Sequence, residues 1–169
     1  MTARLFVAAW PSPDVVAALR ALPRPEVAGL RWTPEDQWHV TLRFLGQVGS
    51  VEPLSSALRA LDLGVSLPVE ARLGPKTMRL GKEILAVGVT GLDRLAALVV
   101  EVTTGIGQAP DARRFRGHIT LARSRGVDLR PLCGAAVSGS WTVSEITIVS
   151  SRTQPDRAHY EVVERFGAS

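Results

Sequence analysis

The sequence predicts an α+β fold built on a largely antiparallel sheet, and three observations support this prediction. Short apolar runs of strand length recur along the chain, bounded by glycine or proline. Segments with apolar residues at helical spacing lie between these runs. The two kinds of segment follow one another as pairs of strands with single helices between them. This order is typical of antiparallel α+β folds, whereas a parallel sheet needs a regular alternation of strand and helix.

The first predicted strand and helix lie within residues 5–22. Residues 5–10 (LFVAAW) form an apolar run of strand length. A helix start follows at residues 12–14, where a serine can cap, a proline can occupy the first turn and an aspartate can face the positive helix end. Apolar residues then recur at helical spacing until Pro23 stops the helix.

The later elements follow the same signals. We expect strands at residues 30–32, 38–45, 65–73, 84–89, 115–122, 141–149 and 158–166, and helices at residues 53–61, 92–102 and 128–137. Glycine patterns of the dinucleotide-binding or phosphate-loop type are absent from the sequence. The nearest approach, Gly105 and Gly107, lacks the remaining glycine and the Lys-Ser/Thr pair.

Length and composition favour one globular domain over residues 1–169, with room for two small lobes at most. Hydrophobic residues make up 46% and charged residues 21%, which excludes a disordered or fibrous chain. The single cysteine, Cys133, excludes internal disulfides and four-thiolate metal sites and fits a reducing compartment. The first apolar run is too short to span a bilayer or to be a signal peptide. We therefore expect a soluble, cytoplasmic protein without a membrane partner.

The charge balance permits a polyanionic partner without requiring one. The formal net charge is +4, from 20 basic and 16 acidic residues, and 18 of the basic residues are arginine. A guanidinium grips phosphate oxygens two at a time, so the arginines are candidates for phosphate recognition. A GC-rich genome would enrich arginine as well, and the sequence is also rich in alanine, glycine and valine. Each arginine therefore needs its own argument.

Two of the three histidines lie in the same four-residue context. His39-Val40-Thr41-Leu42 and His118-Ile119-Thr120-Leu121 each combine histidine, a β-branched apolar residue, threonine and leucine on a predicted strand. Side chains of a strand alternate between faces, so each histidine shares a face with its threonine. Two such strands side by side would line a cleft with two His-Thr pairs.

This pair of motifs points to acid/base chemistry on a phosphodiester. Two imidazoles that titrate near neutrality can act as one general base and one general acid. Threonine hydroxyls are short, rigid donors for the non-bridging oxygens of a phosphate. One histidine would deprotonate water or a ribose hydroxyl and the other would protonate the leaving oxygen. The residues alone do not tell which histidine has which role.

Metal binding is the alternative interpretation of the two histidines. It needs three or four ligands at helical or hairpin spacing, and the sequence offers no HxxxH motif or neighbouring carboxylate. We therefore expect no metal and no cofactor. The third histidine, His159, has no partner pattern and is expected at the surface.

At these residues the sequence resembles the two-histidine phosphoesterase superfamily, in its branch of RNA 2′,3′-cyclic phosphodiesterases, also called 2′-5′ RNA ligases. The resemblance covers nearly the whole chain. Residues 4–8, 31–46 and 116–123 are similar to the opening strand and the two motif segments of the family, and residues 150–152 with Tyr160 resemble its C-terminal hairpin. Gly117 stands where the family usually has proline. The resemblance implies two pseudo-symmetric lobes of antiparallel sheet, with outer helices, around a central cleft.

The resemblance also implies residue roles. His39 would protonate the departing 3′ oxygen and His118 would activate water, giving a 2′-phosphate end. Thr41 and Thr120 would hold the phosphate, with help from Arg123. Weak reverse joining of a 2′,3′-cyclic phosphate to a 5′-hydroxyl follows from microscopic reversibility.

Further residues are weaker candidates for substrate contact. Arg114 belongs to a basic cluster with its neighbours ahead of the second motif, which is either a contact for the RNA backbone or a solvated loop. Arg43 and Arg152 could also bind phosphate. Aromatic residues could stack a terminal base but are more often core, so they stay outside the predicted site: Trp10, Phe44 and Tyr160.

The sequence thus predicts a monomeric, metal-independent phosphodiesterase that opens RNA 2′,3′-cyclic phosphate ends, with free nucleotides as further candidate ligands. One alternative is the same chemistry on 2′-5′ oligonucleotides, small cyclic nucleotides or ADP-ribose 1″,2″-cyclic phosphate. Another is a non-catalytic binder of RNA ends. The presence of both histidines and both threonines argues against a pure binder.

Overall fold

The computed structural model describes residues 3–155 and 157–167. This part of the chain holds nine strands and three α-helices. The strands are β1 (Ala3–Ala9), β2 (Leu30–Trp32), β3 (Val40–Val48), β4 (Val69–Leu80), β5 (Ile84–Thr90), β6 (His118–Ser124), β7 (Gly139–Val143), β8 (Glu145–Thr153) and β9 (Ala158–Gly167). The helices are α1 (Pro13–Arg20), α2 (Glu52–Ala60) and α3 (Asp93–Val102). Each strand pairing is antiparallel, which confirms the predicted α+β class.

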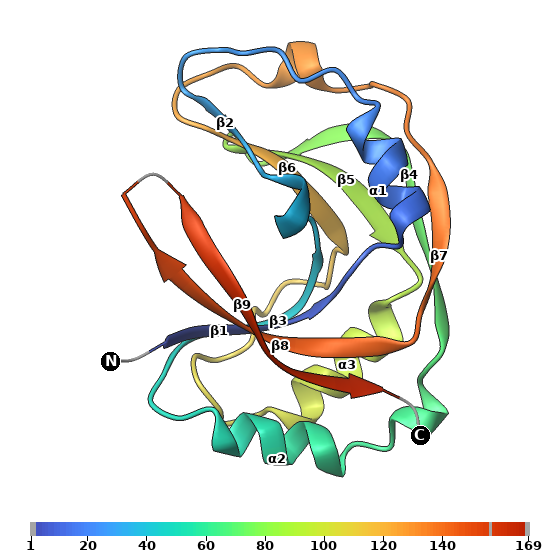
Figure 1. Cartoon of the computed structure of the whole chain (residues 1–169), viewed down its shortest axis with the longest axis vertical. Helices are drawn as coiled ribbons and strands as arrows, with labels where there is room; N and C mark the ends of the chain where they lie inside the picture. Colours follow the sequence, from blue (N-terminus) through green and yellow to red (C-terminus); the bar gives the residue numbers. More distant parts are fainter. Residues whose placement is uncertain (1–2, 156, 168–169) are drawn as a thin grey trace.

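The strands form one sheet in the order β7-β4-β5-β6-β3-β1-β8-β9, with β2 paired to β6. Only Ser144 separates β7 from β8, although six strand spacings, about 29 Å in a flat sheet, lie between them. A two-residue step spans at most about 7 Å. The sheet must therefore curl until β7 approaches β8, and Figure 1 shows this curled half-barrel.

The sheet divides into two halves at its centre. The first half is β3-β1-β8-β9 and the second half is β6-β5-β4-β7, and β3 meets β6 at the single residue pair Val40–Ile119. The halves are the two expected pseudo-symmetric lobes, because each has its motif strand at the junction and three further strands beyond it.

Two of the helices cross between these halves. α1 follows β1 of the first half but packs against β7 of the second. α3 follows β5 of the second half but packs against β3 of the first. In Figure 1, α1 lies beside β7 in the upper part of the view, and α2 and α3 lie below the strands. These helix contacts thus hold the two halves together.

The local signals for α1 act as the sequence predicts. The Ser12 side chain accepts a hydrogen bond from the backbone N–H of Val15, Pro13 occupies the first turn, and Val15 and Leu19 are buried. The buried apolar residues of the helices and of one sheet face form a single large core. Trp38, directly before His39, is 1% exposed and belongs to this core.

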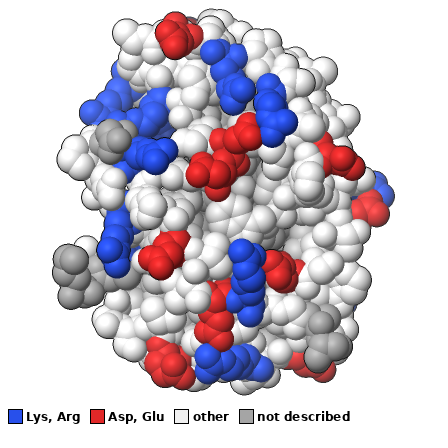
Figure 2. Space-filling view, in the orientation of Figure 1, with Lys and Arg blue, Asp and Glu red and all other residues white. Residues whose placement is uncertain are grey.

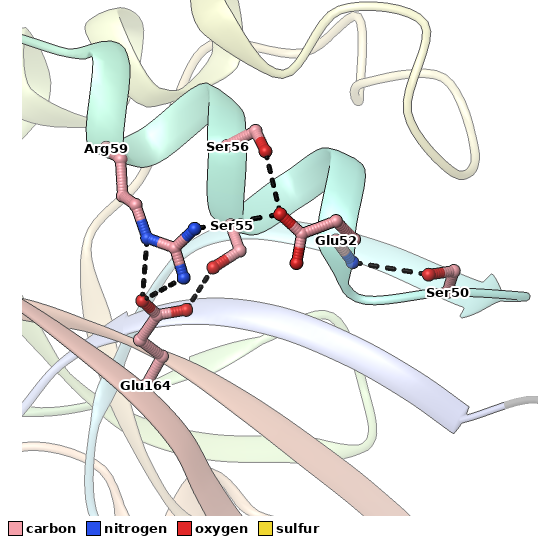
Figure 3. Close-up of polar contacts among 6 residues, drawn as sticks. All are labelled: Ser50, Glu52, Ser55, Ser56, Arg59 and Glu164. Atoms are coloured by element: carbon pink, nitrogen blue, oxygen red, sulfur yellow. Dashed lines mark hydrogen bonds and ion pairs between the residues drawn. The ribbon is translucent and has the colours of Figure 1, made fainter.

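α2 is attached to the edge of the first half by a small polar network (Figure 3). Glu164 on β9 accepts a hydrogen bond from the Ser55 hydroxyl and two from the Arg59 guanidinium, at 2.8 and 3.1 Å. Arg59 also lies 3.6 Å from Glu52 in the first turn of the same helix. These contacts fix α2 against β9.

Three predicted elements differ from the structure. The expected helix at 128–137 is only a 3₁₀ turn, Arg130–Leu132, since Pro131 and the positive φ of Gly134 do not suit a longer helix. The expected strand at 65–73 begins later and continues to Leu80 through an irregularity in its pairing with β5. The expected strand at 141–149 is two strands, β7 and β8, one in each half.

None of the helices in the described ranges is long and apolar enough to cross a membrane.

Candidate active site

The two His-x-Thr motifs lie side by side at the junction of the halves. Val40 on β3 pairs with Ile119 on β6, and both side chains are fully buried in the large core. Because strand side chains alternate, the flanking residues point to the opposite face. His39, Thr41, His118 and Thr120 are all partly exposed there. We call this face of the sheet, away from the large core, the motif face.

A β-bulge follows each motif at the same position. Against β1, residues Ala8 and Val7 pair with Thr41 and Arg43, so Leu42 is the extra residue. Against β5, residues Ala86 and Leu85 pair with Thr120 and Ala122, so Leu121 is the extra residue. Each bulge lets two consecutive residues face the core before the alternation resumes.

The bulges determine which residue after each motif is the next to point to the motif face. The fifth residue after each histidine is exposed, Phe44 in the first half and Arg123 in the second. The preceding residues, Arg43 and Ala122, are buried. Arg123 therefore lies beside the second His-Thr pair.

The prediction that Arg43 binds phosphate is wrong. Its side chain is 4% exposed and is directed toward the loop after α3. Its guanidinium donates hydrogen bonds to the carbonyls of Phe44 (2.7 Å) and Gln108 (2.8 Å) and to the Thr103 hydroxyl (3.2 Å). The bulge at Leu42, which the sequence does not reveal, turned this residue inward. Arg43 ties the loop that leads to the second motif to β3.

Arg114 and Arg152 are not brought to the two histidines. Arg114 is exposed in the loop before β6 and has no hydrogen bond or ion pair within the described residues. Arg152 is exposed on β8, next to Ser151, which pairs with Tyr160. Since Tyr160 lies on the motif face, alternation directs Arg152 to the other face.

Both imidazoles are oriented in the same way. Nδ1 of His39 lies 2.7 Å from the carbonyl oxygen of Gln37, and Nδ1 of His118 lies 2.8 Å from that of Arg116. A carbonyl only accepts, so Nδ1 carries the proton in each neutral ring and Nε2 has the free lone pair. In the first half this Nε2 accepts a hydrogen bond from the Thr41 hydroxyl at 3.0 Å.

Gly117 allows the second motif strand to start close to β5. A Cβ atom at this position would lie 2.5 Å from the carbonyl oxygen of Val89. The Val89 N–H donates a hydrogen bond to the Gly117 carbonyl at 2.8 Å. Hydrogen bonds to the carbonyls of Arg116 and Gly117 therefore fix the position of His118.

Three aromatic rings surround His39. The ring centroids of Phe6, Trp10 and Tyr160 lie 4.9, 5.5 and 5.6 Å from the imidazole. Phe6 and Tyr160 also contact each other edge to face at 5.2 Å, and together with small apolar neighbours these rings form a second, separate cluster on the motif face. We call Phe6, Trp10 and Tyr160 the aromatic wall.

Sequence reasoning missed the aromatic wall. The sequence favours a core position for Trp10 and Tyr160, and no local signal marks Phe6 as a site residue. The alternation of β1 could have shown that Phe6 and Ala8 share a face, but which face required the pairing with β3. The third candidate, Phe44, lies apart from His39, with the Arg4 guanidinium 5.6 Å from its ring centroid.

The surroundings favour the neutral form of both histidines. Burial lowers the pKa of His39 to about 4; the bond to Gln37 opposes this shift, and the positive charges of His118 and Arg123 add to it. Burial also lowers the pKa of His118, opposed by its bond to Arg116 O and assisted by Arg116 and Arg123. Nε2 of each neutral ring carries no proton and is thus a proton acceptor at neutral pH.

Within residues 3–155 and 157–167, no group of three or more His, Cys, Asp or Glu side chains is placed to hold a metal ion. His159, which we expected at the surface, is exposed.

Both the sequence and the curled antiparallel sheet resemble those of known phosphoesterases. Residues 10–71 match the family of LigT-like phosphoesterases. An RNA 2′,3′-cyclic phosphodiesterase of Aeropyrum pernix is 28% identical over 72% of this chain and 77% of its own length. One of Geobacillus stearothermophilus is 36% identical over 54% of this chain, a match that spans 32% of that relative.

A solved structure has a similar fold over nearly the whole chain. The crystal structure of Escherichia coli LigT complexed with 3′-AMP has a TM-score of 0.77 and 26% identity, and covers 99% of this chain and 98% of LigT. The chain is thus similar to LigT-like phosphoesterases in sequence over residues 10–71 and in fold over nearly its whole length.

Proposed function

We propose that this phosphoesterase hydrolyses RNA 2′,3′-cyclic phosphate ends to 2′-phosphates, acting as a monomer without a metal ion. The observation that carries the proposal is the matched orientation of two imidazoles, each with Nδ1 bound to a backbone carbonyl, on one face of the sheet, with the Thr41 hydroxyl bonded to Nε2 of His39. The names of the relatives from Geobacillus and Aeropyrum support the substrate class. The LigT complex with 3′-AMP supports binding of nucleotides at such a site.

In the proposed reaction, water attacks the phosphorus and the bond from phosphorus to the 3′ oxygen breaks. Nε2 of His118 accepts a proton from the attacking water, and Nε2 of His39 donates a proton to the departing 3′ oxygen. Thr41, Thr120 and Arg123 hold the non-bridging oxygens. With a 5′-hydroxyl in place of water as the nucleophile, the same proton transfers would join the two ends while the 3′ oxygen departs, and this ligation is expected to be weak.

The low pKa of His39 fits this role only in the presence of substrate. An acid with a pKa of about 4 is almost fully deprotonated at neutral pH. A phosphate anion within hydrogen-bond distance favours the charged imidazolium and raises the pKa. Substrate binding is therefore expected to bring one proton onto His39, which is then available for the leaving oxygen.

The test is incubation of the purified protein, with EDTA present, with a short RNA that ends in a 2′,3′-cyclic phosphate. Phosphatase sensitivity and mass identify the product, which is expected to be a 2′-phosphate. His39→Ala and His118→Ala are each expected to lower kcat by roughly 10²–10⁴-fold, the usual size for one lost general acid or base. His159→Ala is the matched control, because His159 is exposed and outside the site.

A 3′-phosphate product would retain the two-histidine mechanism but reverse which oxygen leaves. Activity on 2′-5′ oligonucleotides or small cyclic nucleotides alone would change the substrate. Tight binding of RNA ends without turnover of any of these substrates would replace the enzyme with a binder.

A further inference from the structure

A hollow of about 340 Å³ lies next to the second motif. It is lined by Gly29, Leu30, Arg31, Arg123 and Arg125, from β2 and the end of β6. Figure 2 shows Lys and Arg side chains gathered on the upper left of this view, where Figure 1 places β2 and the outer ends of β8 and β9. The hollow is therefore a cationic extension of the site at Arg123.

The three arginines of the hollow have no carboxylate partner among the described residues. Some surface arginines elsewhere do, as in the pairs Arg113–Asp111 and Arg130–Asp128, whereas others, such as Arg114, do not. Arg31 and Arg123 are also direct cross-strand partners in the pairing of β2 with β6. Like charges at opposed positions destabilise a sheet, so this arrangement is unfavourable for the fold and favourable for an anion.

The backbone holds the walls of the hollow in place. The Arg125 N–H donates a hydrogen bond to the Gly29 carbonyl at 2.8 Å. Gly29 has φ +86°, and a Cβ atom here would lie 2.9 Å from the carbonyl oxygen of Arg125. The close approach and the left-handed backbone both favour glycine. The guanidiniums thus project from a fixed frame, which lowers the ordering cost of binding an anion.

The arginines of the hollow extend away from the reactive centre with a spacing that suits the phosphates of a nucleic-acid strand. Arg123 is close enough to influence the titration of His39, His118 and Tyr160, so it lies at the centre. Arg125 follows β6 directly, two residues beyond Arg123, and two residues of chain span at most about 7 Å. That step is comparable with the separation of successive phosphates in an extended RNA strand.

We propose that Arg31 and Arg125 bind the phosphodiester on the 5′ side of the terminal nucleoside while Arg123 holds the reactive phosphate. This inference rests on the proposed function and deepens it, because it makes an oligonucleotide end a better substrate than a nucleoside 2′,3′-cyclic phosphate. Phosphate contacts carry no sequence information, so the preference is for an additional nucleotide of any base.

The experiment compares a nucleoside 2′,3′-cyclic phosphate with a dinucleotide that ends in the same group. The wild-type protein is expected to have a higher kcat/KM for the dinucleotide. Arg31→Gln and Arg125→Gln are each expected to lower that value roughly tenfold, and to lower the value for the mononucleotide less than about threefold. Arg94→Gln, at an exposed position of α3, is the matched control and is expected to retain the preference.

A second measurement separates failure of this inference from failure of the proposed function. The Kd of a dinucleotide bearing a 2′-phosphate, measured against salt concentration, should have a slope of log Kd that is smaller in Arg31→Gln by about 0.7, the value for one contact to a single strand. This binding reports on the hollow even if neither substrate is hydrolysed.

Two results would overturn the inference: equal kcat/KM of the wild-type protein for the two substrates, or an unchanged preference and salt slope in both variants. Misfolding of the variants is not a concern for Arg31→Gln. Removal of the cross-strand repulsion between Arg31 and Arg123 is expected to leave its Tm equal to or above that of the wild type.

Discussion

The two halves of the sheet have the same motif and the same bulge but differ in the walls around the histidines. In the first half, Phe6 pairs with Phe44 after the bulge; at the same positions in the second half, Ile84 pairs with Arg123. Trp10 stands over His39, whereas the β5 residue opposite His118 is Gly88. One imidazole is enclosed by aromatic rings, and the other lies in a more open, cationic setting.

This difference indicates how a repeated backbone can carry two chemical roles. Rings that exclude water keep His39 uncharged until an anion arrives, whereas arginines near His118 attract that anion. An apolar wall also suits a nucleoside, and a cationic wall suits phosphates. The backbone geometry is shared, so the roles are set by the side chains at a few equivalent positions.

The largest expected effect distinguishes the roles of the two histidines. A phosphodiester with a nitrophenolate leaving group needs little protonation of that group. With this substrate, the His39→Ala variant is expected to recover most of its roughly 10²–10⁴-fold loss, while His118→Ala remains impaired. The measurement is kcat/KM of both variants on the RNA end and on the nitrophenyl diester. Equal rescue of the two variants would contradict the assignment of acid and base.

The next prediction concerns stability against pH. The pKa of His39 is near 6.5 in the unfolded chain and about 4 in the folded one, so between these values the unfolded state binds more protons. The free energy of unfolding should therefore fall as pH drops from 6.5 to 4, by about 3 kcal/mol at most, because the ring is partly exposed. Urea unfolding at several pH values measures this slope.

His39→Gln is expected to flatten this pH dependence, and His159→Gln, which changes an exposed histidine, should leave it as in the wild type. A slope that persisted in His39→Gln would assign the lost stability to other groups.

The pH profile of activity gives a third comparison. One histidine must be charged and the other neutral, so kcat/KM should be bell-shaped with its maximum midway between the two pKa values of the free enzyme. Both values are lowered, so the maximum is expected below pH 6.5. Trp10→Ala admits water to His39 and should raise its pKa by roughly one unit and move the maximum upward.

Histidine ring proton shifts in NMR titrations measure this pKa directly. Trp10→Phe retains a ring and is expected to shift the value less. If Trp10→Ala titrated like the wild type, the aromatic wall would not be the cause of the low pKa.

The smallest expected effect lies at the edge of the first half. Glu164→Gln weakens the charged contacts with Arg59 that attach α2 to β9 and should lower the free energy of unfolding only slightly. The pair is largely exposed, which keeps the cost small. Thermal unfolding measures the loss, and kcat on the RNA end is expected to remain at the wild-type value.

The sequence was sufficient to predict the α+β class and the face shared by each His-Thr pair, because both follow from local periodicity. It was insufficient wherever the answer depended on pairing between distant segments. No local sequence signal marks the bulges at Leu42 and Leu121. Regular alternation without the bulge at Leu42 would place Arg43 on the motif face, which is why its predicted role is wrong. The contact between Phe6 and Tyr160 depends on the pairing of β8 with β1 and with β9. The hollow depends on the pairing of β2 with β6, which makes Arg31 and Arg123 neighbours.

The one-residue connection at Ser144 has a consequence for how the protein is made. β7 completes the edge of the second half, and β8 and β9 complete the first. Neither half can therefore acquire its last strands until residues 139–167 have left the ribosome. Until then, the outer edge of β1 and that of β4 have no strand partner. Both halves are thus expected to reach their final form together, late in synthesis, since pairings distant in sequence form slowly.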